Sequence, residues 1–163
     1  ILQRTGISRC SFYYYFKTKE GFGAELIDRY RHFITQKLER CLSDTSLSPL
    51  GSLRAFVGEV RDEMARTDCR SGCLVGKLAQ EVNTLPENFR EQLSAVFAEW
   101  QDVFARGLKR AQETGEISPE LDCASTAAFF WYGWEGALQR ANLELNIKPV
   151  DIFIGNFFSR LTG

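Results

Sequence analysis

The chain has 163 residues, of which 44% are apolar and 25% charged, a composition that is typical of a folded soluble protein and argues against intrinsic disorder. Its longest unbroken apolar run, Ala127 to Trp134, is far shorter than the roughly 20 residues that cross a bilayer, so we expect a cytoplasmic protein without a membrane span. The net charge is −1, but residues 1–43 hold eight basic and four acidic side chains whereas residues 44–163 hold twelve and seventeen, so the front is basic and the remainder acidic.

Apolar side chains recur every three or four residues along nearly the whole sequence, which predicts an all-α fold. The first part is expected to hold the end of one helix, a short helix over 8–14 and a long helix over 19–42 with Thr18 as its N-cap. The polar stretch 43–49 interrupts this pattern. Later helices are expected near 50–67, 73–83, 87–113, 120–144 and 149–161, separated by Gly, Pro or Asn. Because the sequence starts within an apolar pattern and not with Met, we also expect residues before Ile1.

The segment over residues 5–11 has the chemistry of a helix-turn-helix. Gly6 supplies the permissive backbone of a tight turn between helices, and Ser8 can cap the free amides of the helix that follows. We therefore expect a short helix to begin here and to be presented at a fixed angle to its neighbours.

Two faces are expected on that short helix. Phe12 and Phe16 share one side at i, i+4 spacing, while Arg9 and Tyr13 share another. A basic, hydroxyl-bearing face suits the major groove of DNA. The alternative is that the aromatic run is only a buried core stripe.

Residues 5–20, with the sequence TGISRCSFYYYFKTKE, resemble the signature of the TetR family of transcriptional repressors. The resemblance implies a homodimer that binds a palindromic operator in double-stranded DNA and is released by an inducer. It implies a DNA-binding domain over 1–43, made of the last part of the helix-turn-helix and a connecting helix, and a core sensor and dimerisation domain over 44–163. The side chains expected to contact DNA are Thr5, Ser8, Arg9, Ser11, Tyr13, Tyr14, Lys17 and Lys19.

A second short motif lies at residues 71–77. It predicts a helix with Ser71 as its N-cap, Cys73 in the first turn and Lys77 one turn further on. The helix dipole and the nearby lysine are expected to lower the pKa of the thiol and so to raise its reactivity. The alternative is that Cys73 is a small buried apolar side chain, and Cys69 is a candidate resolving thiol.

Residues 71–82 resemble the equivalent segment of the NemR-like branch of the family, whose members sense electrophiles and oxidants through a cysteine. This resemblance implies that Cys73 is the sensor. Where that branch places a lysine beside the thiol, this sequence has Asn142, with Arg140 two residues earlier. The inducer is therefore expected to be an electrophile or a small molecule.

A reversible ligand without thiol chemistry is the competing trigger, and aromatic and aliphatic side chains of the later helices are candidate walls for its pocket. Arg140, Glu135 and Gln139 are candidate polar contacts, although solvent exposure or interface pairing explains them equally well. The candidate walls are Phe56, Val60, Met64, Leu78, Phe97, Trp100, Phe104, Phe130, Trp131 and Trp134.

The last two predicted helices carry more aromatic side chains than one buried stripe requires, which indicates a partner surface. In TetR-like proteins these two helices of each subunit pair into a four-helix dimer bundle. The residues expected at the dimer interface are Ile152, Phe153, Phe157 and Phe158. The alternative is a monomer that buries them.

An enzyme with Cys73 as its nucleophile is the remaining alternative. Catalysis would need a base, and the single histidine, His32, lies on the helix next to the DNA-contacting segment. We therefore expect no catalytic residues. Five scattered cysteines, an odd number, do not indicate a disulfide framework, and we expect neither a metal nor a cofactor.

Overall fold

The computed structural model describes residue 6 and residues 8–162, and it confirms the all-α prediction. Every regular element within this part of the chain is a helix. The elements are α2 (Arg9–Phe16), α3 (Lys19–Ser43), α4 (Pro49–Arg66), α5 (Leu74–Gln80), the 3₁₀ helix η1 (Val82–Thr84), α6 (Glu87–Glu113), α7 (Cys123–Glu144) and α8 (Lys148–Thr162).

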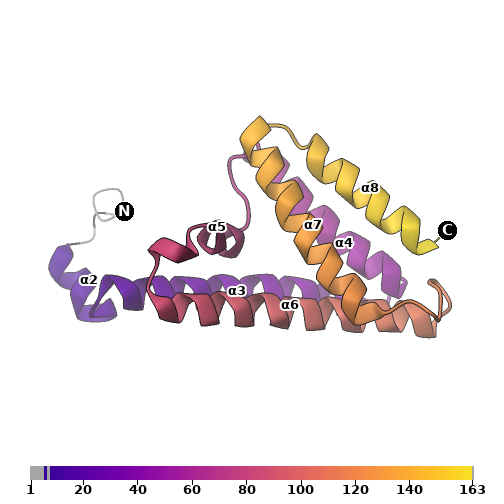
Figure 1. The fold of residues 1–163 in the computed structure, drawn as a ribbon, viewed down its shortest axis with the longest axis horizontal. Helices are drawn as coiled ribbons and strands as arrows, with labels where there is room; N and C mark the ends of the chain where they lie inside the picture. Colours follow the sequence, from indigo (N-terminus) through magenta and orange to yellow (C-terminus); the bar gives the residue numbers. More distant parts are fainter. Residues whose placement is uncertain (1–5, 7, 163) are drawn as a thin grey trace.

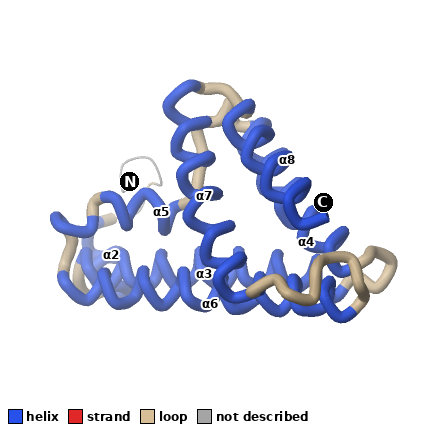
Figure 2. Tube along the Cα trace, turned by 45° about the vertical axis from the view of Figure 1, so that its right-hand side comes forward, coloured by secondary structure: helices blue, strands red, loops and turns tan. Residues whose placement is uncertain are grey.

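The two longest helices, α3 and α6, run side by side along the length of the molecule (Figure 1). Helix α2 lies at one end of α3, on the side of the molecule away from α8. Helix α4 packs on α3 and α6, α7 crosses α6, and α8 packs on α7, so that these three helices stand over the other half of the long pair (Figure 2). The short α5 lies between α2 and α7 along the long pair and contacts both α3 and α6 (Figure 1).

Several helices begin where the sequence offers a capping side chain. Ser8, Thr18 and Ser48 each accept a hydrogen bond from the backbone N–H three residues later, and Asp122 accepts two at the start of α7. Each cap satisfies amides that have no partner within the helix, which fixes the first turn. The cap at Asp122 also explains why α7 starts three residues after the predicted position of 120.

The helix predicted over 73–83 is shorter than expected and is divided. Its regular part is α5, which has seven residues, and the chain then continues as the 3₁₀ turn η1. Cys73, and not Ser71, is the N-cap of α5. The prediction of Ser71 as the cap was wrong because the chain is still extended at Cys73, with φ −72° and ψ 120°.

The core lies between α3, α4, α6 and α7. Trp100 stacks on Trp131 with 5.1 Å between ring centroids, and Phe104 stacks on Phe130 at 4.1 Å. Gly107 allows α6 to approach α3 and α4, since a Cβ there would lie 2.8 Å from side-chain atoms of both Leu42 and Leu53. Within the described residues, no helix is long and apolar enough to cross a membrane.

Candidate functional site: an N-terminal helix and an aromatic pocket

Helix α2 presents most of its polar side chains to solvent. Tyr13 is 53% exposed and Tyr14 80%, and Ser8, Ser11, Lys17 and Lys19 are exposed as well. Arg9 is the first residue of α2, but its side chain lies outside the described residues, as does the whole of Thr5. The described side chains that were predicted to contact DNA are therefore accessible. Sequence reasoning missed Tyr15, which is 75% exposed and follows Tyr14 in the same aromatic run.

The opposite face of α2 is held on the start of α3 by three phenylalanines. The ring centroids of Phe12, Phe16 and Phe22 lie 4.9 to 5.2 Å from one another. Aromatic pairs at this spacing stabilise a contact beyond the area that they bury. The two faces expected from the sequence thus separate: the phenylalanines orient α2, and the tyrosines and lysines face solvent.

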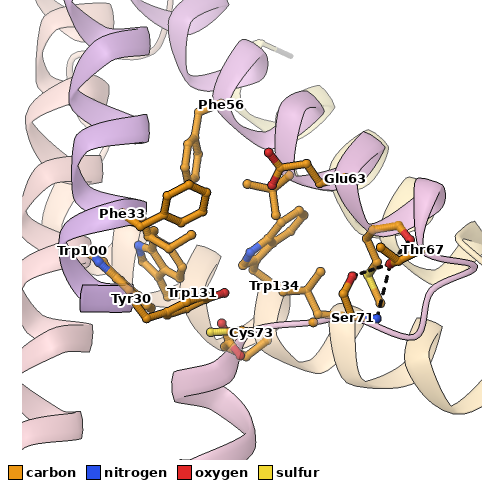
Figure 3. Close-up of a pocket in the computed structure, with 16 residues that line it drawn as sticks. Tyr30, Phe33, Phe56, Glu63, Thr67, Ser71, Cys73, Trp100, Trp131 and Trp134 are labelled. Atoms are coloured by element: carbon orange, nitrogen blue, oxygen red, sulfur yellow. Dashed lines mark hydrogen bonds between the residues drawn. The ribbon is translucent and has the colours of Figure 1, made fainter. Parts of the chain in front are cut away.

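A pocket of about 290 Å³ lies further along α3, where Tyr30, Phe33 and Ile34 contribute to its lining (Figure 3). Its aromatic walls come from α3 (Tyr30, Phe33), α4 (Phe56), α6 (Trp100) and α7 (Trp131, Trp134). The volume is at the lower end of the range for small-molecule sites in proteins, and such sites are mostly apolar with a few polar groups. All three tryptophans of the chain line this one pocket.

The structure sorts the predicted pocket residues into two groups. Phe56, Val60, Met64, Trp100, Trp131, Trp134, Cys73 and Glu135 line the pocket. Phe104 and Arg140 do not: the Phe104 ring is fully buried in the core against Phe130, and Arg140 is exposed and pairs with Glu144. Leu78, Phe97, Phe130 and Gln139 are also absent from the lining.

Sequence reasoning missed several lining residues, above all Tyr30 and Phe33 on α3, together with Glu63, Thr67 and Ser71. Their spacing carried a usable signal, because Tyr30 and Phe33 lie three residues apart and so share a helix face. That face was not recognised because α3 was treated only as the connection to the DNA-contacting segment.

Cys73 and Tyr30 lie close together in the pocket lining (Figure 3), and Glu135 of α7 lines the pocket beside them. The Cys73 sulfur accepts a hydrogen bond of 3.3 Å from the Gly76 N–H, and the Glu135 carboxyl is a neighbour of its thiol. Gly76 makes room for that carboxyl: a Cβ there would lie 1.8 Å from Glu135 Oε2. No group of three or more residues suited to holding a metal ion occurs among the described residues.

Burial controls the protonation of this cluster. Desolvation raises the pKa of Glu135 to about 7, an effect that the neighbouring Cys73 thiol only partly opposes. Desolvation and the neighbouring Glu135 raise the pKa of Cys73 well above its usual value. The expected lowering of the Cys73 pKa was therefore wrong, because the thiol is buried beside a carboxyl group while Lys77 is exposed to solvent.

Asn142 holds the segment that leads to Cys73. Its side-chain amide donates to the backbone carbonyl of Cys69 at 2.8 Å and to that of Ser71 at 3.1 Å. Asn142, which occupies the position where the NemR-like branch has a lysine, thus contacts the backbone of the loop and not the thiol. We infer that Asn142 fixes where Cys73 lies.

Charged pairs connect α3 to the helices around the pocket. Lys37 pairs with Glu63 and Arg40 with Glu59, both across to α4, and Arg31 pairs with Glu99 of α6 at 2.6 Å. Lys37 is only 5% exposed, so its pair with Glu63 is shielded from water on the α3 side. Glu63, which lines the pocket, is thus in direct contact with a side chain of α3.

The outer surface of α7 and α8 differs from the prediction. Ile152 is 54% exposed and Phe153 is half-buried, but Phe157 and Phe158 are buried within the single chain, at 5% and 0%. Phe158 therefore has no surface left for a partner, and its assignment to an interface was wrong. Further exposed apolar side chains, which the sequence did not point to, lie on α7: Phe129, Tyr132 and Leu143.

Comparison with known proteins places these features in context. Residues 49–157 match the family model described as "Tetracyclin repressor-like, C-terminal domain". Transcriptional regulator AcuR of Cereibacter sphaeroides is 41% identical over 157 residues, which cover 96% of this chain and 72% of that protein. A crystal structure of regulatory protein TetR from Rhodobacter sphaeroides matches with a TM-score of 0.93 at 41% identity, covering 96% of this chain and 82% of that one.

A more distant relative bears on the cysteine. The HTH-type transcriptional repressor NemR of Escherichia coli strain K12 is 26% identical over 159 residues, which cover 93% of this chain and 76% of that protein. The similarity therefore extends well beyond the twelve-residue segment around Cys73 on which the resemblance was first based.

Proposed function

Because the chain belongs to the TetR family of transcriptional regulators, we propose that it is a repressor which leaves its operator when a small molecule fills the aromatic pocket. Membership of the family makes the chain a DNA-binding regulator and not an enzyme. The observation that carries the proposal is the pocket itself, because it lies against α3, the helix that follows directly on α2.

On the DNA side, we propose that α2 is the reading helix. Its exposed tyrosines and the exposed lysines at Lys17 and Lys19 are suited to phosphate and base contacts, and the phenylalanine face fixes its orientation on α3. Two copies related by a two-fold axis would read a palindrome. The boundary of the DNA-binding domain is proposed in the short loop after Ser43, where α3 ends.

For the second copy, we propose the outer face of α7 and α8. Phe129, Tyr132 and Leu143 follow one another at spacings of three to eleven residues that keep them near one face of α7, and Ile152 adds to it from α8. Gly136 and Gly155 both have open space around the position of a Cβ, which leaves room for close approach of another helix. An exposed apolar surface of this kind is typical of an interface.

The pocket is proposed to act on DNA binding through α4 and α3. Glu63 of α4 lines the pocket and pairs with Lys37 of α3, so a ligand that moves the α4 wall also pulls on α3 and on α2 at its end. A coupling free energy of about 1 to 3 kcal/mol is the usual allosteric range and weakens operator binding roughly 5- to 150-fold. No larger effect is needed to switch transcription.

The test has two steps on the full-length protein. Small aromatic molecules are first screened by tryptophan fluorescence, since all three tryptophans line the pocket. Molecules that bind are then added to a band-shift titration with the DNA upstream of the gene. We expect those that bind the pocket to weaken the complex by the factor given above, whereas tight pocket binding with unchanged operator affinity would contradict the proposal.

A second candidate is covalent sensing at Cys73, and it is favoured by the position of the thiol in the pocket lining against Glu135. With an α,β-unsaturated carbonyl compound, the sulfur would bond to the β carbon while the thiol proton passes by way of Glu135 to the α carbon. The raised pKa of Cys73 makes this depend on Glu135 accepting the proton.

Quinones and aldehydes separate the two triggers. If sensing is covalent, an electrophile adds its mass to the peptide that contains Cys73, the band shift weakens, and Cys73→Ser abolishes both effects. If sensing is reversible, Cys73→Ser keeps its full response to the inducer. Unchanged operator affinity after complete modification of Cys73 would remove the covalent candidate.

A further inference from the structure

The charged groups in the pocket lining are all of one sign. Glu63 and Glu135 line the pocket, and no lysine, arginine or histidine does so within the part of the chain that the structure describes. The other polar groups of the lining are neutral: the hydroxyls of Tyr30, Thr67 and Ser71 and the thiol of Cys73. The pocket therefore has no group that would compensate the charge of an anion.

The two carboxyl groups differ in their partners. Glu63 is neutralised by Lys37. Glu135 makes no ion pair with any described residue, and its Oε1 is buried without a hydrogen-bond partner. Lys77 is exposed, and it shares with Glu135 only a separate hollow of about 70 Å³ outside the pocket. A buried, unpaired carboxyl is costly, and a positive charge beside it removes that cost.

A cation site needs aromatic rings as well as an unpaired carboxyl, and the walls of the pocket supply the rings. Six aromatic rings surround the pocket, and the face of an aromatic ring attracts a cation within about 6 Å of its centroid. The rim already shows this chemistry, because the Lys37 ammonium lies 5.0 Å from the centroid of the Phe33 ring and pairs with Glu63. The same combination of ring and carboxyl recurs on α7, where Trp131 lies one helical turn before Glu135 and both residues line the pocket.

We propose that the effector of this pocket is a small lipophilic cation, such as an aryl or alkyl ammonium ion, whose charge lies against Glu135 and whose apolar groups lie against the aromatic walls. The inference rests on the proposed function, since it names the chemistry of the effector. A carboxylate of the same size would bring a second negative charge to Glu135 and find no basic partner. The volume of about 290 Å³ limits the ligand to a small molecule.

The first test compares three probes of similar shape and different charge on the full-length protein: phenyltrimethylammonium, its neutral isostere tert-butylbenzene, and benzoate. Binding is followed by tryptophan fluorescence. We expect the ammonium ion to bind at least tenfold more tightly than either of the other two. Equal or tighter binding of tert-butylbenzene or benzoate would overturn the cation assignment.

The second test uses pH. The titratable neighbours of Glu135 are Tyr30 on α3, Cys73 before α5 and Lys77 on α5. Helix α4 contributes Glu63 to the same pocket lining. Helix α6 adds no charged side chain to it. Of these, Glu135, with a pKa of about 7, changes charge between pH 6 and pH 8. A cation that requires the ionised carboxyl should bind about tenfold more weakly at pH 6 than at pH 8.

Glu135→Gln keeps the size of the side chain and removes the charge. It should weaken phenyltrimethylammonium binding about tenfold at pH 8 and abolish the pH dependence, while the exposed control Glu91→Gln changes neither. A pH dependence that survives in Glu135→Gln would overturn the role of this carboxyl. The band-shift experiment tests the proposed function separately from the charge of the effector. If neutral or anionic ligands bind the pocket and weaken operator binding, the proposed function stands and only the proposal of a cationic effector is wrong.

Discussion

Glu135 shows how one residue can set the chemistry of a pocket. Its carboxyl rests on Gly76, contacts the Cys73 thiol and has one oxygen buried without a partner. Burial raises its pKa from 4.5 to about 7, so the folded protein holds this proton more tightly than the unfolded chain does. Folding is therefore favoured when the group is protonated, and the free energy of unfolding falls as pH rises from about 4.5 through 7.

Glu135→Gln should remove that loss. A shift of this size corresponds to roughly 3 kcal/mol when the group is fully ionised, and somewhat less over the interval from pH 5 to pH 8. We expect urea unfolding to show that the free energy of unfolding of the variant, relative to that of the wild type, increases by about 2 kcal/mol from pH 5 to pH 8. Glu91→Gln is the exposed control, and parallel pH profiles for wild type and Glu135→Gln would show that this carboxyl is not protonated by burial.

At the scale of elements, the loop between α4 and α5 decides what faces the pocket. Asp68 and Cys69 both have positive φ, at 49° and 57°, a conformation that costs about 1 kcal/mol or more per non-glycine residue. The loop keeps this shape because Asn142 of α7 bonds the carbonyls of Cys69 and Ser71. Helix α7 thus positions a segment that is remote from it in the sequence.

Asn142→Ala removes both of these hydrogen bonds and leaves two half-buried carbonyls without their donor. We expect thermal denaturation to show a loss of about 1 to 3 kcal/mol, together with weaker binding of any pocket ligand. The matched control is Asn156→Ala, whose amide bonds only the carbonyl of Ile152 on the exposed side of α8. Equal losses in the two variants would mean that Asn142 has no special part in holding the loop.

At the scale of the whole molecule, the arrangement separates three surfaces. The proposed reading helix lies at one end of α3, the pocket lies between α3, α4, α6 and α7, and the proposed dimer face lies on the outside of α7 and α8 (Figures 1 and 2). Because α3 contacts α2 and also lines the pocket, it connects the proposed reading helix to the proposed ligand site.

A charge placed on the proposed dimer face tests the assembly. Tyr132→Arg should shift the protein from dimer to monomer in sedimentation experiments and weaken operator binding at least tenfold, since a dimer gains from two half-sites. The control is Leu47→Arg, because Leu47 is also exposed, at 41%, but lies in the loop before α4. A dimer that persists in Tyr132→Arg, and in Tyr132→Arg combined with Ile152→Asp, would place the interface elsewhere.

DNA binding by such a dimer should depend steeply on salt. If Arg4, which belongs to the basic first part of the sequence, and the expected DNA contacts Arg9, Lys17 and Lys19 each neutralise one phosphate, two subunits contact about eight, and the slope of log affinity against log salt is near −7. Fluorescence anisotropy with labelled operator DNA between about 50 and 200 mM salt measures this slope. Lys17→Ala should reduce its size by about 2 in the dimer, whereas a slope near zero would exclude the phosphate contacts.

Much of the fold could be read from the sequence because its signals act locally. Helix periodicity and the capping side chains operate over three or four residues, and helices α3, α4 and α6 accordingly begin and end within a residue or so of the predicted positions. The start of α7 differs from its predicted position by three residues, and the largest difference is at α5, a seven-residue helix that is too short for periodicity to define and that packs on α3 and α6.

The pocket depended on contacts that no local pattern contains. Asn142 bonds a carbonyl 73 positions away, and Glu135 lies beside Cys73 only because the packing of α7 brings its carboxyl against Gly76 of α5. The same packing explains three differences from the predictions. Phe158 is buried inside the chain, Phe104 lies in the core against Phe130 and not in the pocket, and Cys73 is a buried thiol with a raised pKa and not the expected thiolate. The sequence by itself determined the helices, the two-faced α2 and the family. Only the tertiary structure decided which side chains share a cavity and which carry charge there, because burial and proximity are properties of the packed chain.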